Sequence, residues 1–317
     1  MCLAQVCKSP INYTGNKYRI LPQFIKYFPK NVDKCIDLFT GGATVAINLI
    51  SEEIIAIDNN PKVINLLKFL KKQDYPTLIK KIDTLIEKYG LSNSYKYGYS
   101  YYIQYVEGNN GLKKYNIEGY KQLKNDYNKL KDKKTDKANL YLYLLMVYAF
   151  NNDIRFNSKG EFNLPVGKTD MNKNNREKIK KYIDICNSKK IEFVCKDFKQ
   201  IDLKDLKGVK FVYADPPYLI TDAVYNENAG WNEKEERELL NLLDKLNKKG
   251  IKFALSNVLQ KKKLNIKNEI LYNWLEKNKD KYFINEIEYH YRSASYNKKN
   301  RDGLEEEVLI TNYKVGE

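Results

Sequence analysis

The chain has 317 residues, with 56 Lys and Arg against 40 Asp and Glu, which gives a formal net charge of +16. A positive surplus of this size favours a polyanionic partner, although lysine-rich compositions also occur in proteins that bind no nucleic acid. No apolar run reaches the roughly 18 residues of a membrane span, the N-terminus has no signal-peptide pattern, and five cysteines with a single histidine offer no zinc-ligand spacing. We therefore expect a cytoplasmic protein with free thiols and no metal or membrane site.

Residues 8–73 are typical of alternating strands and helices. The apolar run at 35–39 ends at Gly41-Gly42 and is followed by ATVAINLI at 43–50, which predicts a strand, a glycine turn and a helix. The run at 53–58 predicts a second buried strand, and Pro61 can begin a helix over 61–72. This alternation predicts a parallel α/β sheet.

Residues 74–190 have a different character, because they are rich in Lys, Asn and Tyr, with twelve tyrosines between Tyr95 and Tyr148. The periodicity at 75–90 and 138–150 predicts helices. The stretch 157–163 predicts a hairpin that turns at Lys159-Gly160. This part interrupts the α/β pattern and indicates an inserted domain.

Residues 191–317 resume the alternation. Strands are predicted at 191–198, 209–214, 251–258 and 306–313, with helices over 238–246 and 269–277. The catalytic or binding edge of such a sheet lies beyond the carboxyl ends of its parallel strands.

The glycine turn is the first candidate binding feature. The segment 37–43 would let a ligand approach backbone amides, and Asp58 ends the next strand, where nucleotide-binding folds place an acid against ribose hydroxyls. A dinucleotide, S-adenosylmethionine or a simple tight turn would each fit this pattern. The absence of GxGxxG counts against a nicotinamide enzyme.

The tetrapeptide Asp215-Pro216-Pro217-Tyr218 is the sharper signal. Four apolar residues lead into it, and the prolines end the strand. The amino group of a purine is a poor nucleophile because its lone pair is delocalised into the ring. A carboxylate and a fixed carbonyl that accept its two N–H bonds would direct that lone pair at an incoming methyl group, and the tyrosine can stack on the base. A plain Asp-Pro turn is the alternative.

These motifs resemble, in order and over nearly the whole chain, the Dam-type class of DNA adenine-N6 methyltransferases. Residues 10–17 resemble that family's cofactor-contacting segment, with Tyr13 where many relatives have tryptophan. The segment 37–43 resembles its FxGxG turn, but Ala43 replaces the last glycine. The resemblance implies S-adenosylmethionine as cofactor, held by Tyr13, Lys17, Asp37, Phe39, Gly41, Asp58, Asp197 and Phe198, and catalytic roles for Asp215, Pro216, Pro217 and Tyr218.

Residues 151–168 are similar to the recognition hairpin of that family. The resemblance implies that Arg155 reaches a guanine, and it adds Asn157 and Pro165 as DNA-binding candidates. Arginine to guanine is also the commonest specific base contact on physical grounds. A phosphate contact or a surface charge is the alternative for Arg155.

We therefore expect an α/β, Rossmann-like S-adenosylmethionine-dependent methyltransferase domain from residues 1–73 and 191–317, with a mostly helical DNA-recognition domain inserted at 74–190. The expected reaction is methyl transfer to adenine N6 in duplex DNA by a monomer or weak dimer, with GATC as the first target to test and a cognate restriction endonuclease as a candidate partner. An RNA adenine methyltransferase, a cytosine-N4 or protein-glutamine methyltransferase, and a non-catalytic DNA-binding protein with this fold remain alternatives.

Overall fold

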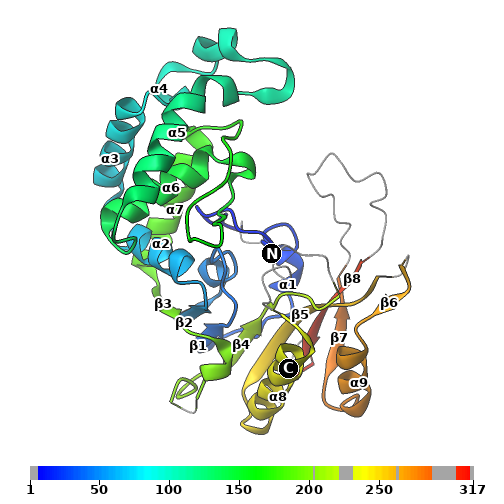
Figure 1. Cartoon of the computed structure of the whole chain (residues 1–317). Coiled ribbons are helices and arrows are strands. Elements are labelled where there is room, and N and C mark those ends of the chain that lie inside the picture. Colours follow the sequence, from blue (N-terminus) through cyan, green and yellow to red (C-terminus); the bar gives the residue numbers. More distant parts are fainter. Residues whose placement is uncertain (1–5, 203, 221–230, 262–263, 288–304, 315–317) are drawn as a thin grey trace.

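A mixed α/β sheet organises the computed structural model, which describes residues 6–202, 204–220, 231–261, 264–287 and 305–314 (Figure 1). Its strands follow the order β3-β2-β1-β4-β5-β8-β7, and β6 pairs with β5 beside this path. The first five strands in this order are mutually parallel, whereas β8 runs antiparallel to both β5 and β7. The strand bounds are β1 Val32–Asp37, β2 Ser51–Asp58, β3 Lys190–Cys195, β4 Phe211–Ala214, β5 Lys252–Lys261, β6 Ile266–Lys267, β7 Phe283–Glu286 and β8 Glu305–Thr311. The prediction of a largely parallel α/β sheet is confirmed.

The central strands are apolar on both faces because helices cover both. Along β1 and β4, successive side chains point to opposite sides: Cys35 and Tyr213 belong to one hydrophobic cluster, and Ile36 and Val212 to the other. The first cluster lies under α1 (Leu21–Phe24), α2 (Pro61–Lys71) and α7 (Lys173–Ser188). The second lies under α8 (Glu233–Lys248) and α9 (Glu269–Lys277). Figure 1 shows α8 and α9 together on one side of the sheet.

The helix predicted after the glycine turn is wrong in extent. Residues 43–50 form turns and a single short 3-10 helix, η1 (Ala46–Asn48). The left-handed backbone of Gly41 and Ala43, with φ of 47° and 63°, folds the chain back before a helix can start. The Asp37 carboxylate then accepts the backbone N–H of Ala46 at 3.0 Å, which fixes this compact loop. The apolar residues are buried, but as loop rather than as helix.

Helices make up most of residues 75–188, between α2 and β3. They are α3 (Tyr75–Lys88), α4 (Ser94–Tyr97), η2 (Ser100–Tyr105), η3 (Gly108–Asn110), α5 (Lys113–Lys129), α6 (Asp136–Tyr148), η4 (Phe150–Asn152) and α7. The apolar residues of α3, α5 and α6 belong to the same hydrophobic cluster as those of α2 and β2. On α7, the Tyr182 hydroxyl donates to the carbonyl of Leu67 at 2.9 Å. The helical segment therefore packs directly on the helices that cover the sheet.

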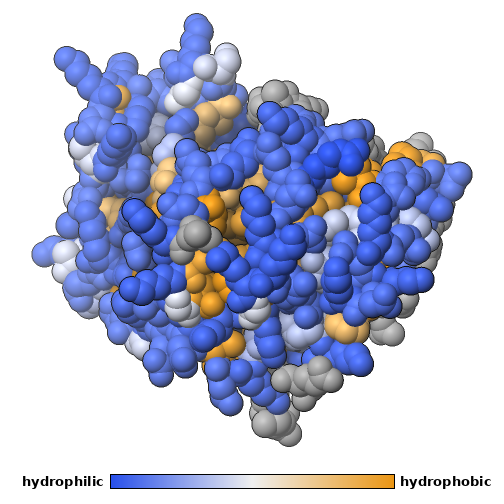
Figure 2. Space-filling model, turned by 90° about the horizontal axis from the view of Figure 1, so that it is seen from below, coloured by the Kyte–Doolittle hydropathy of each residue, from blue (hydrophilic) through white to orange (hydrophobic). Residues whose placement is uncertain are grey.

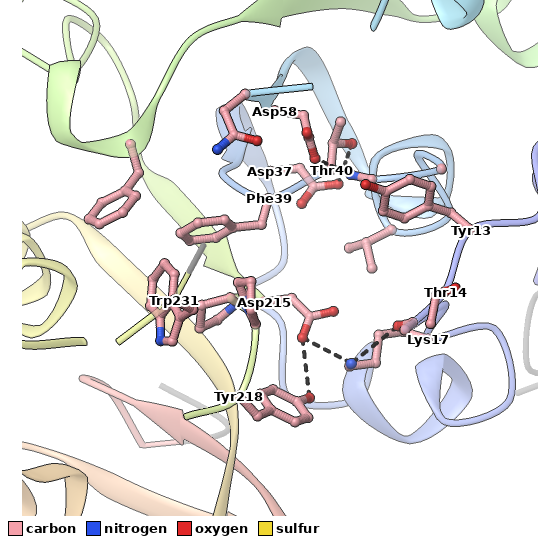
Figure 3. Close-up of a pocket in the computed structure, with 18 of the residues that line it drawn as sticks. Tyr13, Thr14, Lys17, Asp37, Phe39, Thr40, Asp58, Asp215, Tyr218 and Trp231 are labelled. Atoms are coloured by element: carbon pink, nitrogen blue, oxygen red, sulfur yellow. Dashed lines mark hydrogen bonds and ion pairs between the residues drawn. The ribbon is translucent and has the colours of Figure 1, made fainter. Parts of the chain in front are cut away.

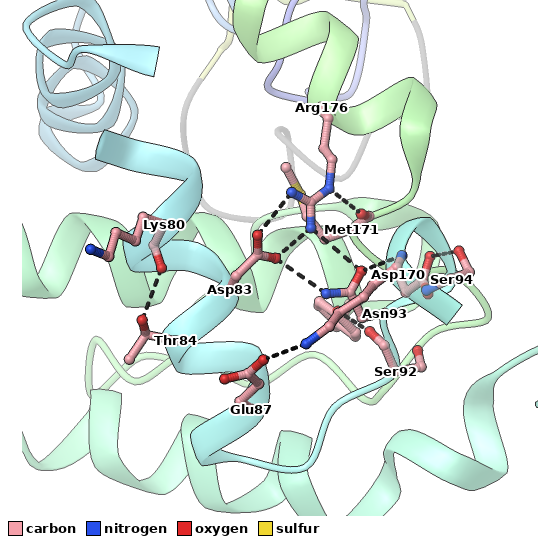
Figure 4. Close-up of polar contacts among 12 residues, drawn as sticks. Lys80, Asp83, Thr84, Glu87, Ser92, Asn93, Ser94, Asp170, Met171 and Arg176 are labelled. Carbon is pink, nitrogen blue, oxygen red and sulfur yellow. Dashed lines mark hydrogen bonds and ion pairs between the residues drawn. The ribbon is translucent and has the colours of Figure 1, made fainter. Parts of the chain in front are cut away.

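A buried arginine joins α3 to α7 (Figure 4). Both terminal nitrogens of Arg176 bond to the Asp83 carboxylate, at 3.1 and 2.5 Å, and its Nε donates to the Met171 carbonyl at 3.2 Å. Asn93 donates to the same carboxylate at 3.2 Å. This network fixes the turn that leads into α4, where exposed tyrosines gather.

No helix in the described ranges is long and apolar enough to cross a bilayer. On the face shown in Figure 2, hydrophilic residues cover most of the surface, and hydrophobic residues are seen mainly in a band across the middle. This agrees with a chain in which 30% of residues are charged.

Candidate active site

A pocket of about 560 Å³ lies where the parallel strands end. Asp37 ends β1, Asp58 ends β2, Asp197 follows β3 and Asp215 follows β4, and all four line it. Figure 3 shows Asp58 and Asp37 at one side of this pocket and Asp215 with Tyr218 at the other. Its volume is within the range of sites for nucleoside-sized ligands. Every residue predicted to bind the cofactor or to act in catalysis lines this pocket.

The Asp58 carboxylate organises the glycine turn. Its Oδ2 accepts the Gly41 N–H at 2.9 Å, and its Oδ1 accepts the Asn60 N–H at 2.8 Å. A carboxylate has about four lone-pair positions, so acceptor capacity remains for a ligand hydroxyl. Burial raises the pKa of Asp58, and these two backbone N–H groups oppose that effect. Asp58, at the end of β2, therefore fixes the turn and keeps acceptor capacity at the pocket wall.

Tyr13 lies against this turn from the N-terminal loop. A Cβ atom on Gly41 would approach Cδ1 of the Tyr13 ring to 2.9 Å, and one on Gly42 would approach the Ile11 carbonyl oxygen to 2.9 Å. Both contacts are closer than real Cβ atoms adopt, so the close packing requires glycine at both positions. The glycines thus shape the wall of the pocket as well as the turn.

Three aromatic rings form another wall. Phe39 lies 5.4 Å from Phe198 and 5.7 Å from Trp231, measured between ring centroids, and Phe198 lies 5.5 Å from Trp231. Asp197 caps the short η5 helix (Phe198–Gln200) by accepting the Lys199 N–H at 2.9 Å. An apolar wall beside a carboxylate is suited to a flat heterocycle that also carries polar groups.

Two polar side chains approach the same oxygen of Asp215. Lys17 Nζ lies 2.9 Å from its Oδ1, and the Tyr218 hydroxyl lies 3.2 Å from the same oxygen (Figure 3). Lys17 is 4% exposed, and its ammonium also lies 4.9 Å from the centroid of the Tyr218 ring. The pocket therefore holds the tetrapeptide in a defined arrangement through a lysine nearly two hundred positions earlier in the chain.

Burial is the largest influence on the pKa values of Asp215 and Asp37. It raises the pKa of Asp215 to about 6, although Lys17 lowers it. It raises the pKa of Asp37 to about 7, with Thr40 and the Ala46 N–H opposing. The Oδ1 atom of Asp37 is buried without a hydrogen-bond partner among the described residues. Perturbed carboxylates that meet in a pocket are typical of functional sites.

Comparison with known protein families decides the relationship. The family model for "D12 class N6 adenine-specific DNA methyltransferase" matches residues 13–300, which is most of the chain. The chain belongs to this D12 class family. The matched range includes the segment from Tyr13 to Lys17, the glycine turn and the tetrapeptide at 215–218. The family resemblance stated from the sequence is therefore confirmed.

Several relatives of this D12 class chain are modification enzymes by name. The Type II methyltransferase M.FokI of Planomicrobium okeanokoites is 38% identical over 96% of this chain and 43% of that protein. Modification methylase StsI of Streptococcus sanguinis is 32% identical over 97% of this chain and 43% of that protein. A DNA adenine methylase of Haemophilus influenzae is 26% identical over 78% of both. The chain thus spans less than half of the length of the first two.

The three DNA-binding candidates of this D12 class chain lie outside the pocket, on the segment 151–168. Asn163 donates its N–H to the Arg155 carbonyl at 3.2 Å and Asn157 to that of Glu161 at 2.9 Å, which forms a hairpin. The exposed Arg155 donates from Nε to the Asn163 side chain at 3.0 Å. Pro165 is exposed, and its carbonyl accepts the N–H of Phe150 at 2.9 Å.

The side chain of Asn157 has a local structural role. Its Oδ1 accepts the Lys159 and Glu161 N–H groups at 3.1 and 2.9 Å, and its Nδ2 donates to the Glu161 carboxylate at 2.9 Å. These bonds build the hairpin turn itself. Its assignment to DNA stays a prediction.

Trp231, which lines the pocket, and Glu307, which contacts Tyr218, are residues of this site that the sequence motifs did not indicate. Trp231 completes the aromatic wall, and its indole N–H donates to Glu236 at 2.8 Å. Glu307, on β8, lies 2.9 Å from the Tyr218 hydroxyl and is 4% exposed. An acid at an inward position of the apolar run 306–313 was the available signal for Glu307. Trp231 had no comparable signal, because a lone tryptophan before a helix is more often part of a core.

Proposed function

We propose that this protein is a site-specific DNA methyltransferase that transfers a methyl group from S-adenosylmethionine to the N6 amino group of adenine in duplex DNA. The observation that carries the proposal is one pocket that joins the Asp58–Gly41 turn to Asp215, Pro216, Pro217 and Tyr218. Membership in the D12 class family supports the same reaction. The whole activity is a proposal because the chain covers 43% of M.FokI and StsI.

The residues at the turn fit S-adenosylmethionine. Asp58 keeps acceptor capacity for ribose hydroxyls, and the rings of Phe39, Phe198 and Trp231 suit the flanks of an adenine. The ionised carboxylate of Asp37 favours a cationic sulfonium in the space near it. When bound, S-adenosylmethionine supplies an electrophilic methyl group.

The tetrapeptide prepares the nucleophile. The Asp215 carboxylate and the Pro216 carbonyl accept the two N–H bonds of the adenine amino group, which concentrates its lone pair on nitrogen. With S-adenosylmethionine bound, the adenine nitrogen would take the methyl group and the sulfur would keep the electron pair of its former bond to carbon, so the nitrogen would have to lose one proton. Asp215, whose pKa burial raises to about 6, can accept that proton near neutral pH. The Tyr218 ring stacks on the extruded base.

Residues 75–188 form the target-recognition part of this proposal. They hold 21 Lys and Arg against 12 Asp and Glu, so +9 of the net charge of +16 lies here. We assign base reading to Arg155, with Pro165 and Asn157 on the same hairpin, and the exposure of Arg155 supports this assignment.

The base of the hairpin also touches the pocket loop, since Asn12 Nδ2 donates to the Asn151 carbonyl at 2.8 Å and Thr14 Oγ1 to Asp153 at 3.3 Å. These two hydrogen bonds therefore connect the base of the hairpin with the loop that lines the pocket.

Incubation with methyl-labelled S-adenosylmethionine tests the function. Duplex DNA, single-stranded DNA and RNA serve as parallel acceptors, and labelled nucleosides are separated after digestion. We expect N6-methyladenine in duplex DNA, and mapping of the methylated adenines gives the recognition sequence, with GATC tested first. Label only in RNA would establish the RNA methyltransferase alternative. Sequence-specific DNA binding without any label would favour the non-catalytic alternative.

A modification role follows from the same reaction. M.FokI and StsI are named as a type II methyltransferase and a modification methylase. We propose that methylation by this protein protects its target from a cognate restriction endonuclease. DNA methylated to completion should resist an endonuclease that cuts the mapped sequence, whereas mock-treated DNA should be cleaved.

A further inference from the structure

Glu307 joins the catalytic cluster from the strand β8. Its Oε1 lies 2.9 Å from the Tyr218 hydroxyl, 3.3 Å from the Ser256 hydroxyl and 3.7 Å from Lys17 Nζ. Its Oε2 is buried and has no hydrogen-bond partner among the described residues. Burial of a carboxylate costs free energy, which its contacts with Lys17 and Tyr218 offset. The presence of an acid at this buried position therefore needs an explanation beyond packing.

The Tyr218 hydroxyl faces two carboxylates but carries one proton. Glu307 Oε1 is 2.9 Å away and Asp215 Oδ1 is 3.2 Å away. A phenol donates one hydrogen bond, so donation to Glu307 leaves the Asp215 oxygen without a bond from Tyr218. Donation to Glu307 also restrains the ring at its hydroxyl end, while the Lys17 ammonium lies 4.9 Å from the ring centroid.

Lys17 is shared in the same manner. Its ammonium lies 2.9 Å from Asp215 and 3.7 Å from Glu307. Without a second carboxylate, the lysine would direct its charge at Asp215 alone and would strengthen its hold on the oxygen that the substrate amino group needs. Glu307 therefore competes with Asp215 for both of its neighbours.

We propose that Glu307 is a positioning residue for the methyl transfer, which orients Tyr218 and draws part of the charge of Lys17 away from Asp215. The Asp215 carboxylate is thereby kept available to accept the amino protons of the target adenine. This inference rests on the proposed function and adds to it a residue that lies outside the tetrapeptide.

The electrostatics around Asp215 agree with this role. The groups that face it are Lys17 from the N-terminal loop, Glu307 from β8, Tyr218 from its own loop, Asp37 from β1 and Tyr213 from β4. After burial and the lowering by Lys17, the negative charge of Glu307 raises the pKa of Asp215. Removal of that charge should therefore lower it.

The variant Glu307→Gln tests the charge with little change of shape, because the amide oxygen can still accept from Tyr218. Methyl transfer from labelled S-adenosylmethionine to duplex DNA is measured from pH 5 to 9 for the full chain. We expect the acid limb of kcat to move to lower pH by roughly half to one unit. Glu306→Gln is the control, because the neighbouring carboxylate bonds to Gln260 at 2.5 Å instead. A limb at the wild-type position in Glu307→Gln would overturn the inference.

A double-variant cycle tests the path through Tyr218. Glu307→Ala and Tyr218→Phe are each expected to lower kcat by about tenfold, and the double variant should fall little below either, since both remove the same hydrogen bond. Fully additive losses would overturn the positioning role. Thermal unfolding of each variant shows that the fold is kept. If the wild-type protein transferred no methyl group, the proposed function itself would be wrong. If the wild type were active but the acid limb of kcat did not move in Glu307→Gln, only the inference about Glu307 would be wrong.

Discussion

The ammonium nitrogen of Lys17 lies 2.9 Å from Oδ1 of Asp215, in a contact where the two side chains are 4% and 14% exposed. The lysine belongs to the loop before α1, and the acid follows β4. A mostly buried ion pair of this kind restrains the Asp215 carboxylate at the wall of the pocket.

Replacement of the acid should stop the reaction and spare the cofactor. We expect Asp215→Ala to lower kcat by about a thousandfold or more, with the cofactor Kd within a few-fold of wild type, because Asp58 and the glycine turn are untouched. Methyl transfer and calorimetric titration of S-adenosylmethionine measure the two effects. Asp33→Ala, an exposed acid on β1, is the control. Near-normal turnover in Asp215→Ala would remove Asp215 from its role.

The wild-type pH profile should have an acid limb near 6. Burial raises the pKa of Asp215 to about 6, and the proposed reaction needs its carboxylate as an acceptor. Activity should therefore fall as pH decreases through this value, because the acid becomes protonated. Single-turnover rates between pH 5 and 8 measure the limb. A limb centred near 4, the ordinary value of an aspartate, would contradict the assignment.

The close contact between the turn and Tyr13 can be tested with one methyl group. In Gly41→Ala, the new Cβ would approach the ring to 2.9 Å, in addition to the strain of φ at 47°. Gly250 also has a positive φ, 68°, but an added Cβ there would have no neighbour within 4 Å. Gly250→Ala is therefore a control that introduces the backbone strain without the steric contact. We expect both variants to lose about 1 to 2 kcal/mol of unfolding free energy, while only Gly41→Ala weakens cofactor binding, by about tenfold or more. Equal affinities would show that Tyr13 yields freely.

Arg155 and Lys159 separate base reading from phosphate contact. Both are exposed on the hairpin. We expect Arg155→Ala to lose about 1 to 3 kcal/mol of discrimination between the mapped site and a single-base variant, and Lys159→Ala to reduce the salt dependence of binding without altering discrimination. Binding and turnover on both DNAs at several salt concentrations provide the measurement. Unchanged discrimination in Arg155→Ala would make it a phosphate contact.

The free energy of unfolding should depend on pH through the protonation of Asp37. Its pKa is about 7 in the fold, against an ordinary 3.8, because of burial. The folded state therefore binds more protons than the unfolded state between about pH 4 and 7. The stabilisation from this group is fully present below about pH 4 and is lost as pH rises through about 7. The loss in the free energy of unfolding is on the order of 4 kcal/mol. Denaturant unfolding of wild type and Asp37→Asn across this range measures it. The variant should show a smaller decline, and equal slopes would contradict the prediction.

Much of the fold was predictable because its signals are local. The helix at 269–277 was predicted at its observed bounds, and the strands beside Asp37, Asp58 and Asp215 follow from short apolar runs between breakers. The helix expected over 43–50 was wrong, since the turn depends on a hydrogen bond from Ala46 to a carboxylate nine positions earlier. Periodicity alone does not reveal such a bond.

The site was predictable in part for the same reason. Motifs identify Asp58 and Asp215 because their residue types stand at recognisable places in the chain. The partners of the tetrapeptide do not have this property: Glu307 and Trp231 come from distant elements, and only the sheet order brings β8 beside β5. The sequence named the acid, and the structure supplies the residues that hold it.

The separation of Lys17 and Glu307 has a consequence during protein synthesis. Lys17 precedes the first strand, whereas Glu307 lies on β8, which can pair with β5 only after residues 305–311 have been synthesised. The adjacent strands β2 and β3 are likewise separated by the helical residues 75–188. A chain arrested before β8 therefore lacks the contacts of Glu307 with Tyr218 and Lys17, and we expect it to modify DNA more slowly than the full chain.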